Sequence, residues 1–266
     1  MKKGITIDKS KCIHCGMCLR DCIVGCLKFN FEKFPEYVEG GENMCVACQH
    51  CFAVCPVGAL TFGDRDPKNS DVAGYGNSEE LLRLIGTRRS IRHYKAQDIP
   101  AETISKLTEM LAYTPKGGNA NTLHFSIVGS LKKMQEISQL TREKISALDT
   151  PLAKILKGYY DKGMDFVYRG APSMIAVSVN LSRAVPGCEN ADPIIALSYL
   201  DLYAQSLGVG TLWTDAALSV AKEIPEIQAM LKIPEGYSLN YIMLLGLPDV
   251  KYHRTSQPDS AYVTIV

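Results

Sequence analysis

Eight cysteines near the start of the chain stand in two copies of one spacing pattern. The segments CIHCGMCLRDCIVGCLKF (12–29) and CVACQHCFAVCPVGALTF (45–62) align without a gap at an offset of 33 residues. Each copy reads C-x2-C-x2-C-x3-C. The repeat indicates an internal duplication, so the first part of the chain is expected to fold as a small unit with two equivalent thiol-bearing loops.

This spacing is typical of ligands to [4Fe-4S] clusters, because two-residue gaps let one tight loop reach three corners of a cube. The fourth cysteine follows a longer gap and reaches the other cluster. The sequence therefore predicts one cluster on Cys12, Cys15, Cys18 and Cys55 and a second on Cys22, Cys45, Cys48 and Cys51. Structural zinc sites are the alternative, since C-x2-C pairs also bind zinc. Residues 1 to about 63 resemble the two-cluster bacterial ferredoxins.

A fifth cysteine in the first copy needs a different explanation. Cys26 aligns with Ala59, whereas Cys22 aligns with a ligand of the second copy. We therefore expect Cys26 to pack as a small apolar side chain. His14 and His50 are expected to be loop residues, because each cluster already has four cysteines.

The overall composition excludes several function classes. With 46% hydrophobic and 21% charged residues the chain is expected to build a core, and its formal charge of +1 gives no reason to expect nucleic acid or an anionic membrane as a partner. The N-terminal lysines precede no apolar run, so no export signal and a cytoplasmic location are expected. Nine of the ten cysteines precede residue 56, which favours reduced, metal-binding thiolates over disulfides. Cys188 is expected to be a structural or incidental thiol.

A linker and a second domain follow the cysteine repeat. The segment GDRDPKNSDVAGYGNS is rich in turn-forming residues, which places a two-cluster domain at 1–63, a linker at 64–78 and a second domain at 79–266. Helices and strands interleave in the second domain, which favours a layered α/β or α+β fold. Hydrophobic periodicity predicts helices at 79–86, 101–112, 131–148, about 193–206 and about 216–231, and strands at 124–129, 173–179 and 239–246.

Three segments of the second domain have residue patterns that can be compared with known ligand-binding motifs. TRRSIRHY (87–94) offers three guanidinium groups and a hydroxyl, which suit a phosphate, although a solvated helix end fits equally. TPKGGNANTLHF (114–125) has paired glycines that allow close approach of a ligand, although a plain turn also explains them. GVGTLWTD (208–215) follows a predicted helix, so it does not match a dinucleotide-binding motif.

An RRSxR motif, a P-x-G/S-x-N loop, a GLGTxW-like segment and a late G-x-P…R occur in this order in the nitroreductase family of FMN flavoproteins. Residues 79 to about 260 resemble that family. The resemblance implies an α+β subunit and a homodimer with two FMN sites at the interface, each fed by both chains.

The resemblance also implies which residues bind FMN. For the phosphate and ribityl chain it implies Arg88, Ser90 and Arg92, with Arg89 contributing through its backbone and Arg254 and Lys251 completing the phosphate clamp. It implies that a loop of the second copy of the chain lies along the flavin. This loop consists of Pro115, Lys116, Gly117 and Asn119. It implies that the N5 edge of the ring system lies next to the main chain of Trp213, Thr214 and Asp215.

Two segments depart from the family pattern and leave the substrate pocket unspecified. Many relatives have N-x-Q-P-W where this chain has NANTL (119–123), and a G-G-F-D ending where this chain has DAA (215–217). Proton donors near these loops could be Tyr94, Tyr113, Lys116 or His124, but packing and solvation explain these residues equally well. No catalytic residue is therefore assigned.

Joining clusters to a flavin suggests a function. A [4Fe-4S] cluster passes one electron at a time, whereas a flavin passes one or two. The sequence thus predicts an FMN-dependent oxidoreductase that receives electrons from a reduced ferredoxin or NAD(P)H and reduces a small electrophile such as a nitroaromatic, quinone or enone. A non-catalytic redox relay or sensor that serves a protein partner is the alternative.

Overall fold

The computed structural model of the chain describes residues 4–266, which form two compact units. The first unit extends to Tyr75 and includes Gly118–Ala120, and the second comprises Gly76–Gly117 and Asn121–Val266. Residues 1–3 of the predicted first domain lie outside the described residues. Each unit has its own buried hydrophobic core and is described by itself.

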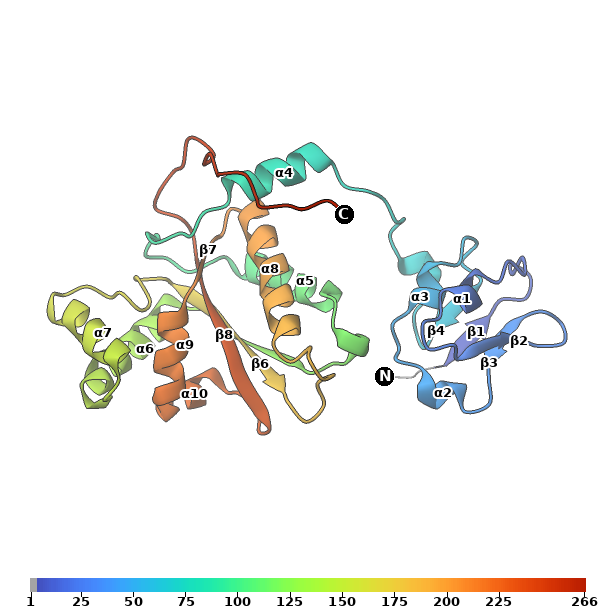
Figure 1. Ribbon diagram of the computed structural model, residues 1–266, viewed down its shortest axis with the longest axis horizontal. Coiled ribbons are helices and arrows are strands. Elements are labelled where there is room, and N and C mark those ends of the chain that lie inside the picture. Colours follow the sequence, from blue (N-terminus) through green and yellow to red (C-terminus); the bar gives the residue numbers. More distant parts are fainter. Residues whose placement is uncertain (1–3) are drawn as a thin grey trace. The chain divides into compact units, whose positions relative to one another are not determined.

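The first unit is a small pair of two-stranded sheets with short helices between them (Figure 1). Strand β1 (Ile5–Ile7) pairs antiparallel with β4 (Leu60–Phe62), and β2 (Leu27–Phe29) pairs antiparallel with β3 (Pro35–Tyr37). The short helices are α1 (Met17–Arg20), α2 (Gly41–Met44) and α3 (His50–Ala53), and a 3-10 turn covers Pro67–Asn69.

The sequence duplication is visible in the backbone of the first unit. Left-handed residues recur at the same places in both copies, 33 residues apart, which curls each cysteine loop in the same way. They are the pairs His14 and Ala47, Gly16 and Gln49, and Gly25 and Gly58. A non-glycine residue with positive φ is uncommon, so its recurrence at His14 and Ala47 indicates that the loop shape is strongly determined.

The second unit is organised around an antiparallel four-stranded sheet in the order β5-β6-β8-β7. The residues of the two central strands are mostly buried, as expected when helices cover both faces. The segment after helix α4 (Ser78–Thr87) adds to the sheet edge, where Ser90 bridges Thr211 in parallel. The strands are β5 (Leu123–Val128), β6 (Ser173–Asn180), β7 (Gly210–Trp213) and β8 (Tyr237–Gly246).

Alternating side chains of β6 supply two separate cores, one on each face of the sheet. Ile175 and Val177 pack against α5 (Ala101–Met110) and α8 (Ala191–Ser206). Met174 and Ala176 belong to the core on the opposite face. That core is closed by α6 (Leu131–Lys144), α7 (Pro151–Asp161), α9 (Asp215–Glu223) and α10 (Pro225–Leu231).

The predicted α+β class with a layered sheet is confirmed, with three differences in detail. The single helix expected at about 216–231 is two helices, because Pro225 lacks the N–H that would continue α9 and instead begins α10. Helix α7 and the short strand β7 were not predicted. Helix α4 (Ser78–Thr87) agrees with its prediction, and its N-terminus is capped by Asn77, whose side chain accepts from Glu79 and Glu80 N–H. Of the helices within residues 4–266, none is long and apolar enough to cross a bilayer.

Candidate functional site

The cysteines of the first unit line two separate cavities, and each cavity draws on both copies of the repeat. The first is lined by Cys12, Cys15 and Cys18 of the first copy together with Cys55 of the second. The rest of its wall is largely apolar and includes Phe29 and Leu60. The structure thus brings together the four residues predicted for one cluster.

The second cavity repeats this arrangement with the copies exchanged. It is lined by Cys45, Cys48 and Cys51 of the second copy and by Cys22 of the first. Cys26 also reaches this wall, and its Sγ lies 3.4 Å from the Sγ of Cys22. The predicted ligand set is therefore assembled here too, with a fifth thiol beside it.

Burial in these apolar cavities disfavours ionised thiols. Desolvation raises the pKa of Cys18 above its usual value, and it raises the pKa of Cys51 to about 11. Burial and the neighbouring Cys22 raise the pKa of Cys26 to about 12. Iron binds thiolate, so its positive charge must compensate the desolvation of each ligand. Four thiols around each desolvated cavity are a donor set that fits a [4Fe-4S] cluster.

The two histidines of the repeat lie at the cavity walls but have partners in the protein. His14 Nδ1 lies 2.9 Å from the carbonyl oxygen of Lys33, and His14 packs against the ring of Phe34. His50 Nδ1 lies 3.1 Å from Oδ2 of Asp21. His14 lies in a loop as predicted, whereas His50 is the first residue of α3 and not a loop residue.

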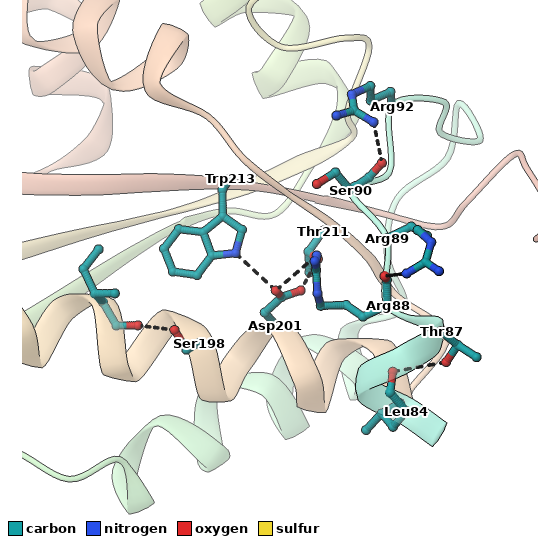
Figure 2. A network of polar contacts seen from close by, with 11 residues as sticks. Leu84, Thr87, Arg88, Arg89, Ser90, Arg92, Ser198, Asp201, Thr211 and Trp213 are labelled. Carbon is teal, nitrogen blue, oxygen red and sulfur yellow. Dashed lines mark hydrogen bonds and ion pairs between the residues drawn. The ribbon is translucent and has the colours of Figure 1, made fainter. Parts of the chain in front are cut away.

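The second unit contains a polar network around Asp201, a residue of α8 that is only 5% exposed (Figure 2). Thr211 Oγ1 donates to Oδ1 of Asp201, and Trp213 Nε1 donates to Oδ2 at 3.1 Å. Arg88 Nη1 lies 3.7 Å from the same Oδ2. Two of the predicted flavin-binding segments, around Arg88 and around Trp213, therefore meet at one buried carboxylate.

A basic cavity lies beside the RRS segment (Arg88, Arg89 and Ser90), on the side away from Asp201. It is lined by Arg83, Arg89, Lys251 and Arg254, with no acidic residue in its wall. The side chain of Arg89, predicted to act through its backbone, thus reaches a cavity with the two predicted clamp residues. Arg89 Nη2 is buried and has no hydrogen-bond partner within residues 4–266. A phosphate oxygen is the kind of acceptor that this orphaned donor lacks, so the cavity fits an anionic group.

Ser90 and Arg92 do not line this cavity. Ser90 sits in the bridge to Thr211, and its carbonyl oxygen accepts from Arg92 Nη1 at 3.3 Å. Successive side chains of an extended segment point to opposite sides. The predicted phosphate clamp is thus divided between two sides of one strand-like segment.

The predicted flavin loop is fixed by α8 and the turn before it. Gly117 N–H donates to both carboxylate oxygens of the buried Asp192, each at 3.1 Å. A methyl group on Gly117 would overlap Sγ of Cys188, so this position has no room for a side chain. Lys116 Nζ donates to the carbonyl oxygen of Thr114 at 3.1 Å. Pro115 is exposed, and Asn119 has a left-handed backbone (φ 52°) and groups with the first unit.

The three predicted flavin residues at the end of β7, Trp213, Thr214 and Asp215, each have a different contact partner. The Trp213 ring packs edge-on against Tyr241 with centroids 5.1 Å apart. Thr214 caps α9 by accepting from Ala217 N–H. Tyr241 donates to Asp215 Oδ1 at 2.7 Å, and burial together with this carboxylate raises the pKa of Tyr241 to about 12.

Sequence reasoning missed Asp201 and Asp192. Both lie on α8, whose other buried residues include Leu197 and Leu200. An acidic residue within a predicted buried apolar helix is the signal that could have identified them, because a buried carboxylate is rare without partners.

Comparison with known proteins gives two matches to protein families. The family described as "Nitroreductase family" matches residues 85–247, which is more than half of the chain. The family described as "4Fe-4S dicluster domain" matches residues 11–59, the segment that contains all eight predicted cluster ligands.

Individual relatives resemble the second part of the chain. A protein of Methanothermobacter thermautotrophicus, named as an NADH dehydrogenase/NAD(P)H nitroreductase, is 25% identical over 177 residues, which are 66% of this chain and 82% of the relative. A nitroreductase of Bacteroides fragilis, solved with bound FMN, is 25% identical with a TM-score of 0.58, and the match covers 70% of this chain and 98% of that one. An FMN-bound nitroreductase of Desulfitobacterium hafniense, at 23% identity and a TM-score of 0.57 over the same shares, shows the same fold.

Proposed function

The chain belongs to the nitroreductase family, and from this premise we propose that it is an FMN-dependent oxidoreductase fed by its own two [4Fe-4S] clusters. Its acceptor is a small electrophile such as a nitroaromatic, a quinone or an enone. Its donor is a reduced ferredoxin or NAD(P)H.

Two cysteine-lined cavities in the same chain as a nitroreductase fold carry this proposal. Each cavity gathers four cysteines from both copies of the repeat. When bound, the clusters supply single electrons, and FMN can combine them into a pair for the acceptor. The protein contributes binding, orientation and a desolvated environment.

Different residues of the predicted flavin domain, 79–266, bind different parts of FMN. Arg88, Ser90 and Arg92 form one basic side of the RRS segment, which we assign to the phosphate and ribityl chain. On its other side Arg89, Lys251 and Arg254 line the basic cavity, which fits an anionic group. The end of β7 serves the ring edge with Trp213, Thr214 and Asp215. The loop of Pro115, Lys116, Gly117 and Asn119 approaches the flavin of a second copy.

Exposed apolar residues support a homodimer. On α4, Leu81, Leu82 and Ile85 are 52%, 70% and 48% exposed, and on α8 Tyr199 is 49% exposed. Contiguous exposed apolar surface marks interaction sites. In this proposal residues 1–63 are the electron-input domain, 64–78 the linker and 79–266 the flavin domain of a cytoplasmic enzyme. Light scattering of the purified chain tests the dimer.

Reoxidation by a small acceptor tests the enzymatic function. The full chain, reconstituted without oxygen, is expected to carry about eight iron atoms and one FMN per chain. Its reduced flavin should be reoxidised rapidly by a nitroarene in stopped-flow measurements. Tightly bound FMN that no nitroarene, quinone or enone reoxidises would contradict the proposal and favour a redox relay to a protein partner.

A further inference from the structure

We infer that Asp201 is a positioning residue that holds Arg88 in place for the FMN phosphate and joins it to the end of β7. The inference rests on the proposed function, because it takes Arg88 to be part of the flavin site. Asp201 itself lies on α8 and is 5% exposed. Its three partners come from two other segments, the residue after α4 and strand β7 (Figure 2).

The two carboxylate oxygens of Asp201 have different partners. Oδ1 accepts from Thr211 Oγ1, and Oδ2 accepts from Trp213 Nε1. A buried carboxylate is destabilising unless it is hydrogen-bonded and paired, and these contacts supply both conditions. Because Trp213 and Arg88 share Oδ2, a displacement of the indole changes the position of the charge that attracts Arg88.

Arg88 is held by charge and keeps its hydrogen-bond donors. Its Nη1 lies 3.7 Å from Oδ2, which is an ion-pair distance but too long for a hydrogen bond. The guanidinium carries five N–H donors, and Asp201 accepts none of them at this distance. Its side chain is 34% exposed, so without a counter-charge it would be free to turn toward solvent. The ion pair therefore fixes the position of the Arg88 guanidinium and leaves its N–H donors available to an anionic ligand.

Electrostatics alone predicts the opposite effect on FMN. A carboxylate beside the phosphate site repels a phosphate, so removing its charge should tighten FMN binding if Asp201 had no role in orienting Arg88. Positioning predicts weaker binding. The sign of the change in FMN affinity therefore distinguishes the two.

Asp201→Asn isolates the ion pair. The Asn oxygen can still accept from Trp213 Nε1, and its NH2 group can donate to the Thr211 hydroxyl, which can act as an acceptor. Only the charge that holds Arg88 is lost. We expect the affinity for FMN to fall about tenfold, while the affinity for riboflavin, which lacks the phosphate, stays unchanged. Asp201→Leu also removes the indole's acceptor, so it should weaken binding of both ligands.

The emission of Trp213 gives a readout that does not depend on the cofactor. It is the only tryptophan in the chain. In the FMN-free protein Asp201→Asn should leave the emission spectrum near that of wild type, whereas Asp201→Leu should shift it. The control is Asp165→Asn, which alters another hydrogen-bonded carboxylate, bound by Ser138 Oγ at 2.8 Å and Tyr160 OH at 3.2 Å. It should leave both ligand affinities and the emission of Trp213 unchanged.

A double-mutant cycle with Arg88→Met completes the test. In the Arg88→Met background Asp201 has no guanidinium to orient, so Asp201→Asn should no longer weaken FMN binding and its effect should follow the electrostatic repulsion alone. Tighter FMN binding by Asp201→Asn, or equal losses for FMN and riboflavin, would overturn the inference while the flavin site stands. If Arg88→Met leaves FMN affinity unchanged, the proposed site is wrong and the inference falls with it.

Discussion

The Sγ atoms of Cys22 and Cys26 lie 3.4 Å apart in the wall of the second cysteine cavity. Cys26 is 2% exposed, as is Ala59 at the equivalent position of the other copy. The two positions are therefore equally buried, but only one carries a thiol. Burial and the neighbouring Cys22 raise the pKa of Cys26 to about 12.

Cys26→Ala should leave both clusters in place. The alanine reproduces the packing found at Ala59, so the reconstituted chain should retain about eight iron atoms and its cluster spectra. Cys22→Ala should lose one cluster. The measurement is iron content together with electron paramagnetic resonance of the reduced protein.

The duplication supplies a matched control for this pair. Ala59→Cys places a thiol beside Cys55, as Cys26 stands beside Cys22, and it too should keep all the iron. Loss of iron in Cys26→Ala together with its retention in Cys22→Ala would mean that Cys26 is the ligand.

Gly117→Ala should destabilise the second unit. The added methyl group would overlap the Cys188 side chain and disturb the bond from Gly117 N–H to Asp192. Overpacking of this kind costs about 1–3 kcal/mol. Denaturant unfolding followed by Trp213 fluorescence reports on this unit alone, because the chain has a single tryptophan.

Removing the obstructing side chain should rescue this variant. Cys188→Gly in the Gly117→Ala background should cost less than the sum of the two single changes. Additive effects would show that Cys188 is not the group that the methyl meets.

Tyr241→Phe should change the alkaline stability of the chain. The pKa of Tyr241 is raised to about 12 by burial and by the Asp215 carboxylate, whereas an unfolded tyrosine titrates near about 10. As the pH rises, Tyr241 thus loses its proton in the unfolded state before it does so in the folded state. The stabilisation from this tyrosine is therefore complete below about pH 10 and is lost as the pH rises toward 12.

The difference in free energy of unfolding between wild type and Tyr241→Phe should therefore shrink above about pH 10. Urea unfolding at a series of pH values measures it. Asp215→Asn, which removes the carboxylate but keeps the tyrosine, should reduce this pH dependence. A difference that is constant across the alkaline range would contradict the assignment.

Arg89→Met should have opposite effects with and without phosphate. It removes a buried donor that has no partner within residues 4–266, so the FMN-free protein should be as stable as wild type or more stable. The increase in melting temperature on adding inorganic phosphate should shrink, because the cavity loses a cation. Lys251→Met should also reduce that increase.

Lys154→Met is the control for the phosphate experiment, since Lys154 is exposed and pairs with Asp149 at 2.7 Å. It should leave the phosphate-induced increase unchanged. The same increase in the wild type, Arg89→Met and Lys154→Met would mean that phosphate acts elsewhere.

The sequence predicted best where the chemistry repeats. The spacing of the cysteines predicted that each cavity draws on both copies, because the fourth cysteine follows a longer gap and reaches the other cluster. The alignment also predicts that Cys26 is the surplus thiol. Its contact with Cys22 could not be read from the pattern, since it depends on how the loop after α1 closes.

Predictions were weaker where residues distant in sequence meet. Asp201 approaches Arg88 only because α8 and the RRS segment both lie beside β7, a strand too short to show a period. The division of Arg88 and Arg89 between two sides requires the extended backbone that the bridge at Ser90 provides. Pro225 was visible in the sequence, but the long apolar period across it favoured one helix over two.

Electron entry through the clusters is the central claim, and stopped-flow reduction of the flavin under nitrogen tests it most directly. Reduced ferredoxin and NAD(P)H serve as donors to wild type, Cys15→Ser, Cys48→Ser and Cys26→Ala, all as full chains loaded with FMN. We predict that each ligand variant slows flavin reduction by at least about tenfold, which corresponds to about 1.4 kcal/mol in the barrier, whereas Cys26→Ala reduces at the wild-type rate. Equal rates in all four proteins would show that electrons reach FMN without the clusters.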